Sequence, residues 1–198
     1  MRRIVFVLGL AVLLAGAGHR VLAAGDAGAF INEAGNSVLK LLNDPKVSQA
    51  QFTQQLHKIA DDDFDVPRIA RFVTGRYWRD ANDSERQQFV KAFSDYMVSV
   101  YAQRFGQYRG SAGFKVMSQR QEGESTMVST EIQRSSGPPA KVVWQVAKSG
   151  DSYKIVDVSI EGVSQALTYR QEFDSVIAQR GGRLPGLTEE LRQKTAQG

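Results

Sequence analysis

The sequence predicts an α+β domain, in which an antiparallel, twisted sheet of four strands or slightly more packs against several helices. Two observations carry this prediction. Apolar residues recur at helical spacing up to about residue 108, and between about residues 114 and 160 their period changes to two. Helical spacing then returns, so a further helix follows the strands. The 198 residues, 42% of them hydrophobic, suffice for one domain with a single core.

Residues 1–23 have the pattern of a secretory signal peptide. Arg2 and Arg3 form a basic start, an apolar run covers residues 4–15, and Val21-Leu22-Ala23 has the small-residue pattern of a cleavage site. The apolar run is shorter than the ~20 residues that a membrane-spanning helix needs, and an uncleaved N-terminal anchor is the alternative. Because the chain also has no cysteine, we expect export to the periplasm.

Removal of the signal peptide changes the charge of the chain. The whole sequence has 25 basic and 21 acidic residues, a net charge of +4. Residues 1–23 contain three arginines and no acidic residue, so the mature chain has 22 basic and 21 acidic residues, or +1. A nearly neutral chain gives no support for nucleic-acid binding, and we expect no nucleic-acid partner.

Four helices are predicted before the strands and one after them. Helical spacing predicts segments at 26–43, 48–60, 65–75, 82–108 and 163–180. Asn82 with Glu85 three residues later is typical of a capping box at the start of the long fourth helix.

Period-two segments predict four strands joined by short connections, which is the pattern of an antiparallel meander. They cover residues 114–121, 126–134, 141–147 and 153–160. Residues 24–182 are expected to form one domain, and 183–198 a polar C-terminal tail with a short helix.

Residue types that perform catalysis are sparse. The mature chain has one histidine, His57, on a predicted helix among polar neighbours, and neither a nucleophile elbow nor a phosphate-binding glycine loop occurs. Asp157 on the last strand is the other candidate acid, although its neighbours Val156 and Val158 place it on the opposite, outward face. We expect no enzymatic activity, no cofactor and no metal. An enzyme of the small cone-shaped α+β type would need His57 or Asp157 to point into a pocket.

Aromatic residues and a methionine dominate one face of the long helix, among them Phe89, Phe93, Met97 and Tyr101. A stripe of this kind either packs against the sheet as ordinary core or lines a cavity for an apolar ligand. The residue pattern alone leaves both interpretations open.

Two groups of motifs resemble the MlaC family, also known as the toluene-tolerance or auxiliary transport component family. The first is FDVPRIARFVTGRYWR at residues 64–79, followed by the long aromatic helix. The second is YKIVDV at 153–158 with EGVS at 161–164 and YRQEF at 169–173. The resemblance covers about Phe30 to Leu191. The family also includes a branch associated with hopanoid synthesis.

The resemblance implies a periplasmic phospholipid carrier with an MlaC-like lipid-binding domain at 24–182 and a lipid cavity between helices and sheet. Its partners would be an inner-membrane ABC transporter complex with its substrate-binding membrane subunit, and an outer-membrane lipoprotein–porin complex. The function implied is maintenance of outer-membrane lipid asymmetry. A carrier of hopanoid or another hydrophobic small molecule, and a non-catalytic periplasmic adaptor, are the alternatives.

On this interpretation two walls hold the acyl chains, and arginines at the mouth meet a head group or an acidic docking partner. The expected helical wall consists of Phe72, Val73, Tyr77, Trp78, Phe89, Phe93, Met97, Val100 and Tyr101. The expected sheet wall consists of Val128, Val142, Trp144, Val156 and Val158, and the arginines are Arg68, Arg71, Arg76 and Arg79. A solvated basic face is the simpler interpretation of the arginines.

Overall fold

The structure is a computed structural model that describes residues 26–106, 113–134 and 137–197, with the side chains of 105 and 106 left undescribed. The predicted signal peptide at 1–23 lies outside the described residues. In the part of the chain that the structure describes, no helix is long and apolar enough to cross a membrane.

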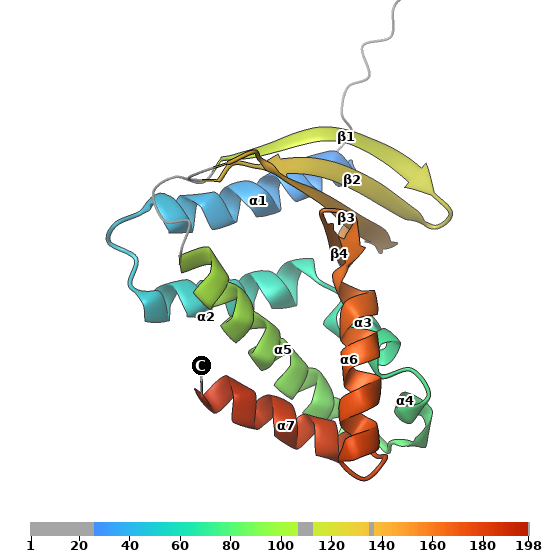
Figure 1. Cartoon of the computed structure of the whole chain (residues 1–198). Coiled ribbons are helices and arrows are strands. Elements are labelled where there is room, and N and C mark those ends of the chain that lie inside the picture. The colour runs from blue at the N-terminus through green and yellow to red at the C-terminus, as the bar shows by residue number, and fades with distance from the viewer. Residues whose placement is uncertain (1–25, 107–112, 135–136, 198) are drawn as a thin grey trace, which may run out of the picture.

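The chain forms an α+β domain, as predicted, with an open antiparallel sheet above a group of helices (Figure 1). The helix α1 lies along the sheet, and α2, α5, α6 and α7 lie further from it (Figure 1). The helices are α1 (Ala27–Asn43), α2 (Gln49–Asp63), α3 (Val66–Thr74), α4 (Tyr77–Asp80), α5 (Asp83–Gly106), α6 (Gln165–Gln179) and α7 (Leu184–Gln197). The strands are β1 (Phe114–Glu122), β2 (Ser125–Ile132), β3 (Ala140–Ser149), β4 (Ser152–Ile160) and β5 (Val163–Ser164).

The sheet is a meander in the order β1-β2-β3-β4-β5, with each strand antiparallel to its neighbours. The two-residue β5 adds to the four predicted strands. Val128, Trp144 and Val158 are aligned across β2, β3 and β4, so they share the face that packs against α1. The register shifts between Gln145 and Val146, which is the irregularity expected of a bulge that bends a sheet.

Two sets of local hydrogen bonds position α5 and the connection between α2 and α3. Asn82 and Glu85 form the predicted capping box before α5: each side chain accepts a hydrogen bond from the other residue's backbone N–H, both at 2.9 Å. Between α2 and α3 the chain pairs with the sheet, because Asp65 N donates to the Ile155 carbonyl at 2.9 Å and Phe64 forms a parallel bridge to Ile155. This pairing anchors the helices to β4.

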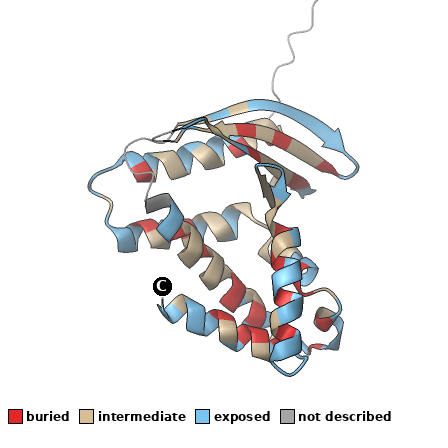
Figure 2. Cartoon of the chain, viewed as in Figure 1, coloured by how far each residue is buried: buried red, intermediate tan, exposed pale blue. Residues whose placement is uncertain are grey.

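Among the described residues, the buried apolar side chains form three separate clusters rather than one. Figure 2 marks the buried residues along the chain in red. We call the three clusters the helical core, built by α3 to α7 with Phe89 and Phe173 at its centre; the sheet core, where α1 packs on the sheet around Ile31 and Val128; and the α2 core, where α2 packs on α5 around Phe52. A domain usually has one contiguous core with small satellites. Here the layers do not merge.

The C-terminal segment, which the sequence predicted to be a polar tail after a domain at 24–182, packs in the helical core. The expected polar tail with a short helix is the 14-residue helix α7, which buries Leu184, Leu187 and Leu191 to an exposed fraction of 2% or less. Its apolar residues recur at spacings of three and four, so they form one stripe that packs against α5.

Candidate functional site

The helix α5 carries two apolar stripes with different environments. One stripe, which includes Phe89 and Phe93, is fully buried in the helical core. The other consists of Val90, Ser94 and Met97, followed one turn later by Tyr101, and all of these are only half-buried. Residues at these spacings lie on one face of a helix, so a half-open face runs along α5 beside a closed one.

The closed stripe contains several residues that the sequence predicted to line the lipid cavity. Phe89, Phe93, Val73 and Tyr77 are 9% exposed or less, and all belong to the helical core. Their partners are the aromatic rings of α6 and the leucines of α7. In this structure α6 and α7, rather than the sheet, cover this side of α5, and contact of these four residues with a lipid stays a prediction.

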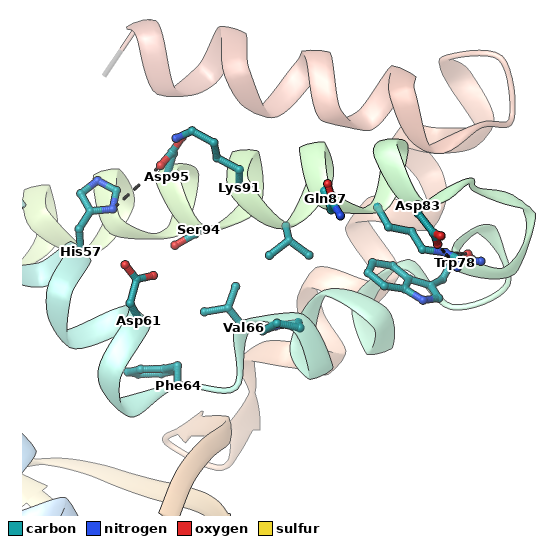
Figure 3. A pocket seen from close by; sticks show the side chains of 13 residues that line it. His57, Asp61, Phe64, Val66, Trp78, Asp83, Gln87, Lys91, Ser94 and Asp95 are labelled. Atoms are coloured by element: carbon teal, nitrogen blue, oxygen red, sulfur yellow. Dashed lines mark hydrogen bonds and ion pairs between the residues drawn. The ribbon is translucent and has the colours of Figure 1, made fainter. Parts of the chain in front are cut away.

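Val90 and Ser94, the first two residues of the half-open stripe, line a groove of about 750 Å³ between α2, α3, α4 and α5 (Figure 3). This volume lies within the range of about 300–1,000 Å³ that is typical of ligand pockets. Phe64, Val66, Pro67, Trp78 and Val90 are its apolar lining. Phe64 also packs against the sheet core, while Val66, Trp78 and Val90 pack against the helical core. The groove therefore opens where two of the separate cores meet.

Charged side chains stand at both ends of the groove. At one end Lys91 Nζ lies 2.8 Å from the Asp95 carboxylate, and His57 Nδ1 lies 4.0 Å from the same carboxylate (Figure 3). At the other end Arg86 forms an ion pair with Asp83 at 3.0 Å.

Arg86 also holds one of the apolar lining residues in place. Its Nε donates to the Trp78 carbonyl at 3.0 Å, and its guanidinium lies 5.7 Å from the centroid of the Trp78 ring. The polar side chains of Asp61, Gln87 and Ser94 also line the groove, so its lining is mixed, with the apolar side chains concentrated around Phe64, Val66, Trp78 and Val90.

Tyr101, at the far end of the half-open stripe, is influenced by ionisable groups of β4 and α6. Burial raises the pKa of the Tyr101 hydroxyl, and the Asp157 carboxylate raises it further, against the opposing effect of Arg104. Burial also raises the pKa of Tyr169 on α6, with Tyr101 as a further contributor. Burial therefore favours the neutral form of both phenols.

The residues of the predicted sheet wall, like those of α5, divide into a buried group and a half-buried group. Val128, Val142 and Val156 are 9% exposed or less, whereas Trp144 and Val158 are half-buried and pack against the sheet core. Of the predicted lining, the structure leaves Trp78, Met97, Val100, Tyr101, Trp144 and Val158 half-buried. Whether these six contact a lipid stays a prediction.

The predicted arginines and Phe72 lie on the outer surface rather than inside the groove. Arg68, Arg71 and Phe72 are exposed on α3. Arg76 is also exposed, where it donates to the Tyr77 hydroxyl at 2.8 Å and lies 3.5 Å from Asp174. Arg79 is exposed on α4. Phe72, predicted to belong to the cavity wall, is thus solvent-exposed and does not line the groove in this structure.

Of the two candidate catalytic groups, Asp157 is held by hydrogen bonds within the fold and His57 lies at the edge of the groove. Asp157 accepts hydrogen bonds from Ser164 Oγ at 2.5 Å, Ala166 N at 3.0 Å and Val158 N at 2.7 Å. Its carboxylate therefore joins β4 to the N-terminus of α6. His57 lies at the rim of the groove, in the middle of α2, with its side chain half-buried. Within the described ranges, no three metal-ligating side chains come together.

Sequence reasoning missed four of the residues that matter here: Phe64, Val66, Val90 and Ser94. Val90 and Ser94 precede Met97 by seven and three residues, so the helical period itself placed them on its face. The aromatic residues of the neighbouring stripe gave the stronger signal. Phe64 and Val66 flank a helix start, where no period exists to indicate which side they face.

Two comparisons with known proteins bear on this arrangement. The family model described as MlaC protein matches residues 32–193, which includes most of α7. A phospholipid-binding protein from Ralstonia solanacearum, solved in complex with a phospholipid, has a similar fold, with a TM-score of 0.76 and 24% sequence identity. The similarity covers 87% of this chain and 98% of that one. The family match spans well over half of the sequence, and the chain therefore belongs to the MlaC family.

Proposed function

We propose that the protein is a periplasmic carrier that encloses the acyl chains of a phospholipid and moves the lipid between inner- and outer-membrane transport complexes. The observation that carries the proposal is the separation of the apolar residues into three cores, with a half-buried stripe on α5 between them. A groove of about 750 Å³ opens onto that stripe. Family membership and the phospholipid-bound structure of similar fold support the same proposal.

A lipid carrier must offset the large free-energy cost of exposing acyl chains to water. Removing a methylene group from water is worth ~0.8 kcal/mol, so two long acyl chains cost on the order of 20 kcal/mol when they are exposed. Polar head groups need no such protection. A carrier therefore needs an apolar slot for the chains with a hydrated opening, and the groove combines an apolar patch around Phe64, Val66, Trp78 and Val90 with charged side chains at its ends.

The half-open stripe gives the chains a path. They enter past Trp78 and Val90, follow Ser94 and Met97 along α5, and reach Tyr101. The small Ser94 side chain leaves room at the middle of the path. Separate cores allow the layers to move apart and admit a lipid without opening either the helical core or the sheet core.

The location and partners follow from the same proposal. The signal pattern at 1–23 supports export to the periplasm. The carrier would exchange lipid with an inner-membrane ABC transporter complex through its substrate-binding membrane subunit, and with an outer-membrane lipoprotein–porin complex. In this role it maintains the lipid asymmetry of the outer membrane.

Mass spectrometry of the purified protein tests the proposal. The whole gene is expressed in a Gram-negative host, and the protein is purified from the periplasm without detergent and extracted with organic solvent. We expect about one phospholipid per protein, and an intact mass that shows cleavage after Ala23 or Ala24. A polycyclic lipid in place of phospholipid favours the hopanoid carrier, and a protein free of lipid favours the adaptor.

A further inference from the structure

Exposed apolar side chains gather along two neighbouring helices. The described residues include four large apolar side chains that are strongly exposed: Phe72 (44%), Met117 (49%), Val163 (56%) and Leu167 (48%). Phe72 lies on α3, Val163 lies just before α6, and Leu167 lies in the first turn of α6. Because α3 and α6 pack side by side, three of the four exposed side chains belong to one part of the surface.

The alignment of the two helices brings these side chains together. Arg170 Nη1 donates to the Phe72 carbonyl at 3.1 Å, and Arg76 Nη2 lies 3.5 Å from Asp174, so each residue on α3 is level with the one 98 positions later on α6. The same offset places Arg68 level with the first turn of α6. Leu167 precedes Arg170 by three residues, which places both on one side of α6.

This surface carries three arginines without an ion pair. Arg68, Arg71 and Arg170 are exposed, and none of them forms an ion pair with another described residue. Arg76, which follows α3 and precedes α4, is paired with Asp174. We call the surface made by Arg68, Arg71, Phe72, Val163, Leu167 and Arg170 the α3–α6 face.

The guanidinium of Arg170 is held in place by three contacts. Its carbon lies 5.0 Å from the centroid of the Phe72 ring, and it donates to the Phe72 carbonyl. It also lies against Gly75, where a Cβ atom would come within 3.2 Å of Nη2. Gly75 has φ +54°, a conformation that favours glycine, so the same residue ends α3 and leaves space for Arg170.

We propose that the α3–α6 face is the docking surface through which the protein recognises an acidic protein surface with an apolar centre. Arginine and aromatic side chains are enriched at the centres of protein interfaces, where lysine is depleted. A guanidinium that is already fixed binds a carboxylate in bidentate geometry and loses little conformational entropy. The unpaired positive charge of the face requires an acidic partner.

The same contacts distinguish a protein partner from a membrane surface. A side chain that anchors a protein in a bilayer inserts its apolar body below the head groups. Phe72 is covered on one ring face by the Arg170 guanidinium, so insertion of its ring would carry a charge with it. A partner with carboxylates around an apolar patch satisfies Phe72, Leu167 and the arginines at once.

Binding measurements with two variants test the docking surface. The proposal rests on the proposed function only for its choice of probes, which are the purified inner-membrane substrate-binding subunit and the purified outer-membrane lipoprotein–porin complex. Arg68→Glu/Arg71→Glu reverses the charge, and Leu167→Gln removes exposed apolar surface without burying a polar group. Arg120→Glu and Met117→Gln are matched controls on β1, where both native side chains are also exposed.

We expect each α3–α6 variant to weaken binding to at least one of the two probes by about tenfold or more, which is the size of a single interface hot spot. The controls change it less than about twofold. The affinity of the wild-type protein also falls as salt rises, because exposed charge pairs are screened. Unchanged affinity of both variants for both probes overturns the proposal.

Two further measurements separate the remaining outcomes. Vesicles of phosphatidylglycerol are tested in parallel. If the α3–α6 variants lose binding to vesicles but keep their binding to both protein probes, the face recognises a membrane rather than a protein. Lipid content and thermal unfolding of every variant are measured as well. A variant that loses docking but keeps its lipid and its melting temperature supports the docking surface. Absence of lipid from all proteins, with docking intact in the wild type alone, contradicts the carrier function and leaves the docking surface standing.

Discussion

Phe93 on α5 meets Phe173 on α6 edge to face, with ring centroids 5.9 Å apart and planes at 86°. Phe93 also stacks on Phe89 at 5.7 Å and meets Tyr169 at 6.3 Å. Edge-to-face and offset pairs at these distances are the favourable arrangements of aromatic rings. Phe93 is therefore buried among aromatic rings, and we expect its main contribution to be to the stability of the fold.

We expect Phe93→Ala to reduce the free energy of unfolding by about 3–5 kcal/mol, because it leaves a cavity among buried rings. Urea unfolding followed by circular dichroism measures the loss. The variant should still retain its lipid per folded molecule, since the ring does not face the groove. Phe93→Leu, which keeps much of the volume, serves as the control and should lose less. Lipid loss in a variant of native stability would return Phe93 to the cavity wall.

Ser94, the next residue along α5, has the opposite role. Its half-buried side chain lines the groove, so Ser94→Trp should fill the path of the acyl chains. We expect the lipid recovered by solvent extraction to fall severalfold while the protein stays folded. Ser84→Trp is the matched control, because Ser84 is exposed near the start of the same helix. Equal lipid content in the two variants would remove the groove from the lipid path.

The comparison of Phe93 with Ser94 shows how far the sequence predicts this molecule. Helical and strand periods correctly predicted the α+β class, the meander and the capping box at Asn82, because these depend on local spacing and hydrogen bonding. The site depends on which of two neighbouring stripes of α5 is covered. That choice is made by α6 and α7, and the short polar-looking sequence of α7 hid its three buried leucines.

Asp157 is expected to stabilise the fold rather than to catalyse a reaction. Its carboxylate accepts hydrogen bonds from Ser164 Oγ and Ala166 N, and it lies at the positive end of the α6 dipole. We expect Asp157→Ala to reduce the free energy of unfolding by about 2 kcal/mol, within the range measured for charged hydrogen bonds and helix caps. Asp151→Ala, in an exposed turn, should have almost no effect in the same thermal unfolding assay.

Tyr101 and Tyr169 predict the response of stability to alkaline pH. Burial raises the pKa of both hydroxyls above the usual value of about 10. The unfolded chain therefore releases these protons first, and their contribution to stability is fully present below about pH 10 and is lost as pH rises from there toward the folded pKa values. Urea unfolding at increasing alkaline pH measures this loss. The double variant Tyr101→Phe/Tyr169→Phe should flatten the pH dependence, and an unchanged slope would contradict the assignment.

The C-terminal helix provides the last prediction. Leu184, Leu187 and Leu191 pack into the helical core beside Phe89, and full burial of each leucine is worth about 1.5–3 kcal/mol. Truncation after Gly182 therefore removes about 5–9 kcal/mol, which is comparable to the whole 5–15 kcal/mol by which a domain is usually stable. We expect the truncated protein to be unfolded or to aggregate, as judged by circular dichroism and size-exclusion chromatography. Truncation after Thr195 keeps all three leucines and should leave melting nearly unchanged. A folded, lipid-loaded protein that ends at Gly182 would show that α7 is dispensable, because the closed stripe of α5 would then tolerate solvent.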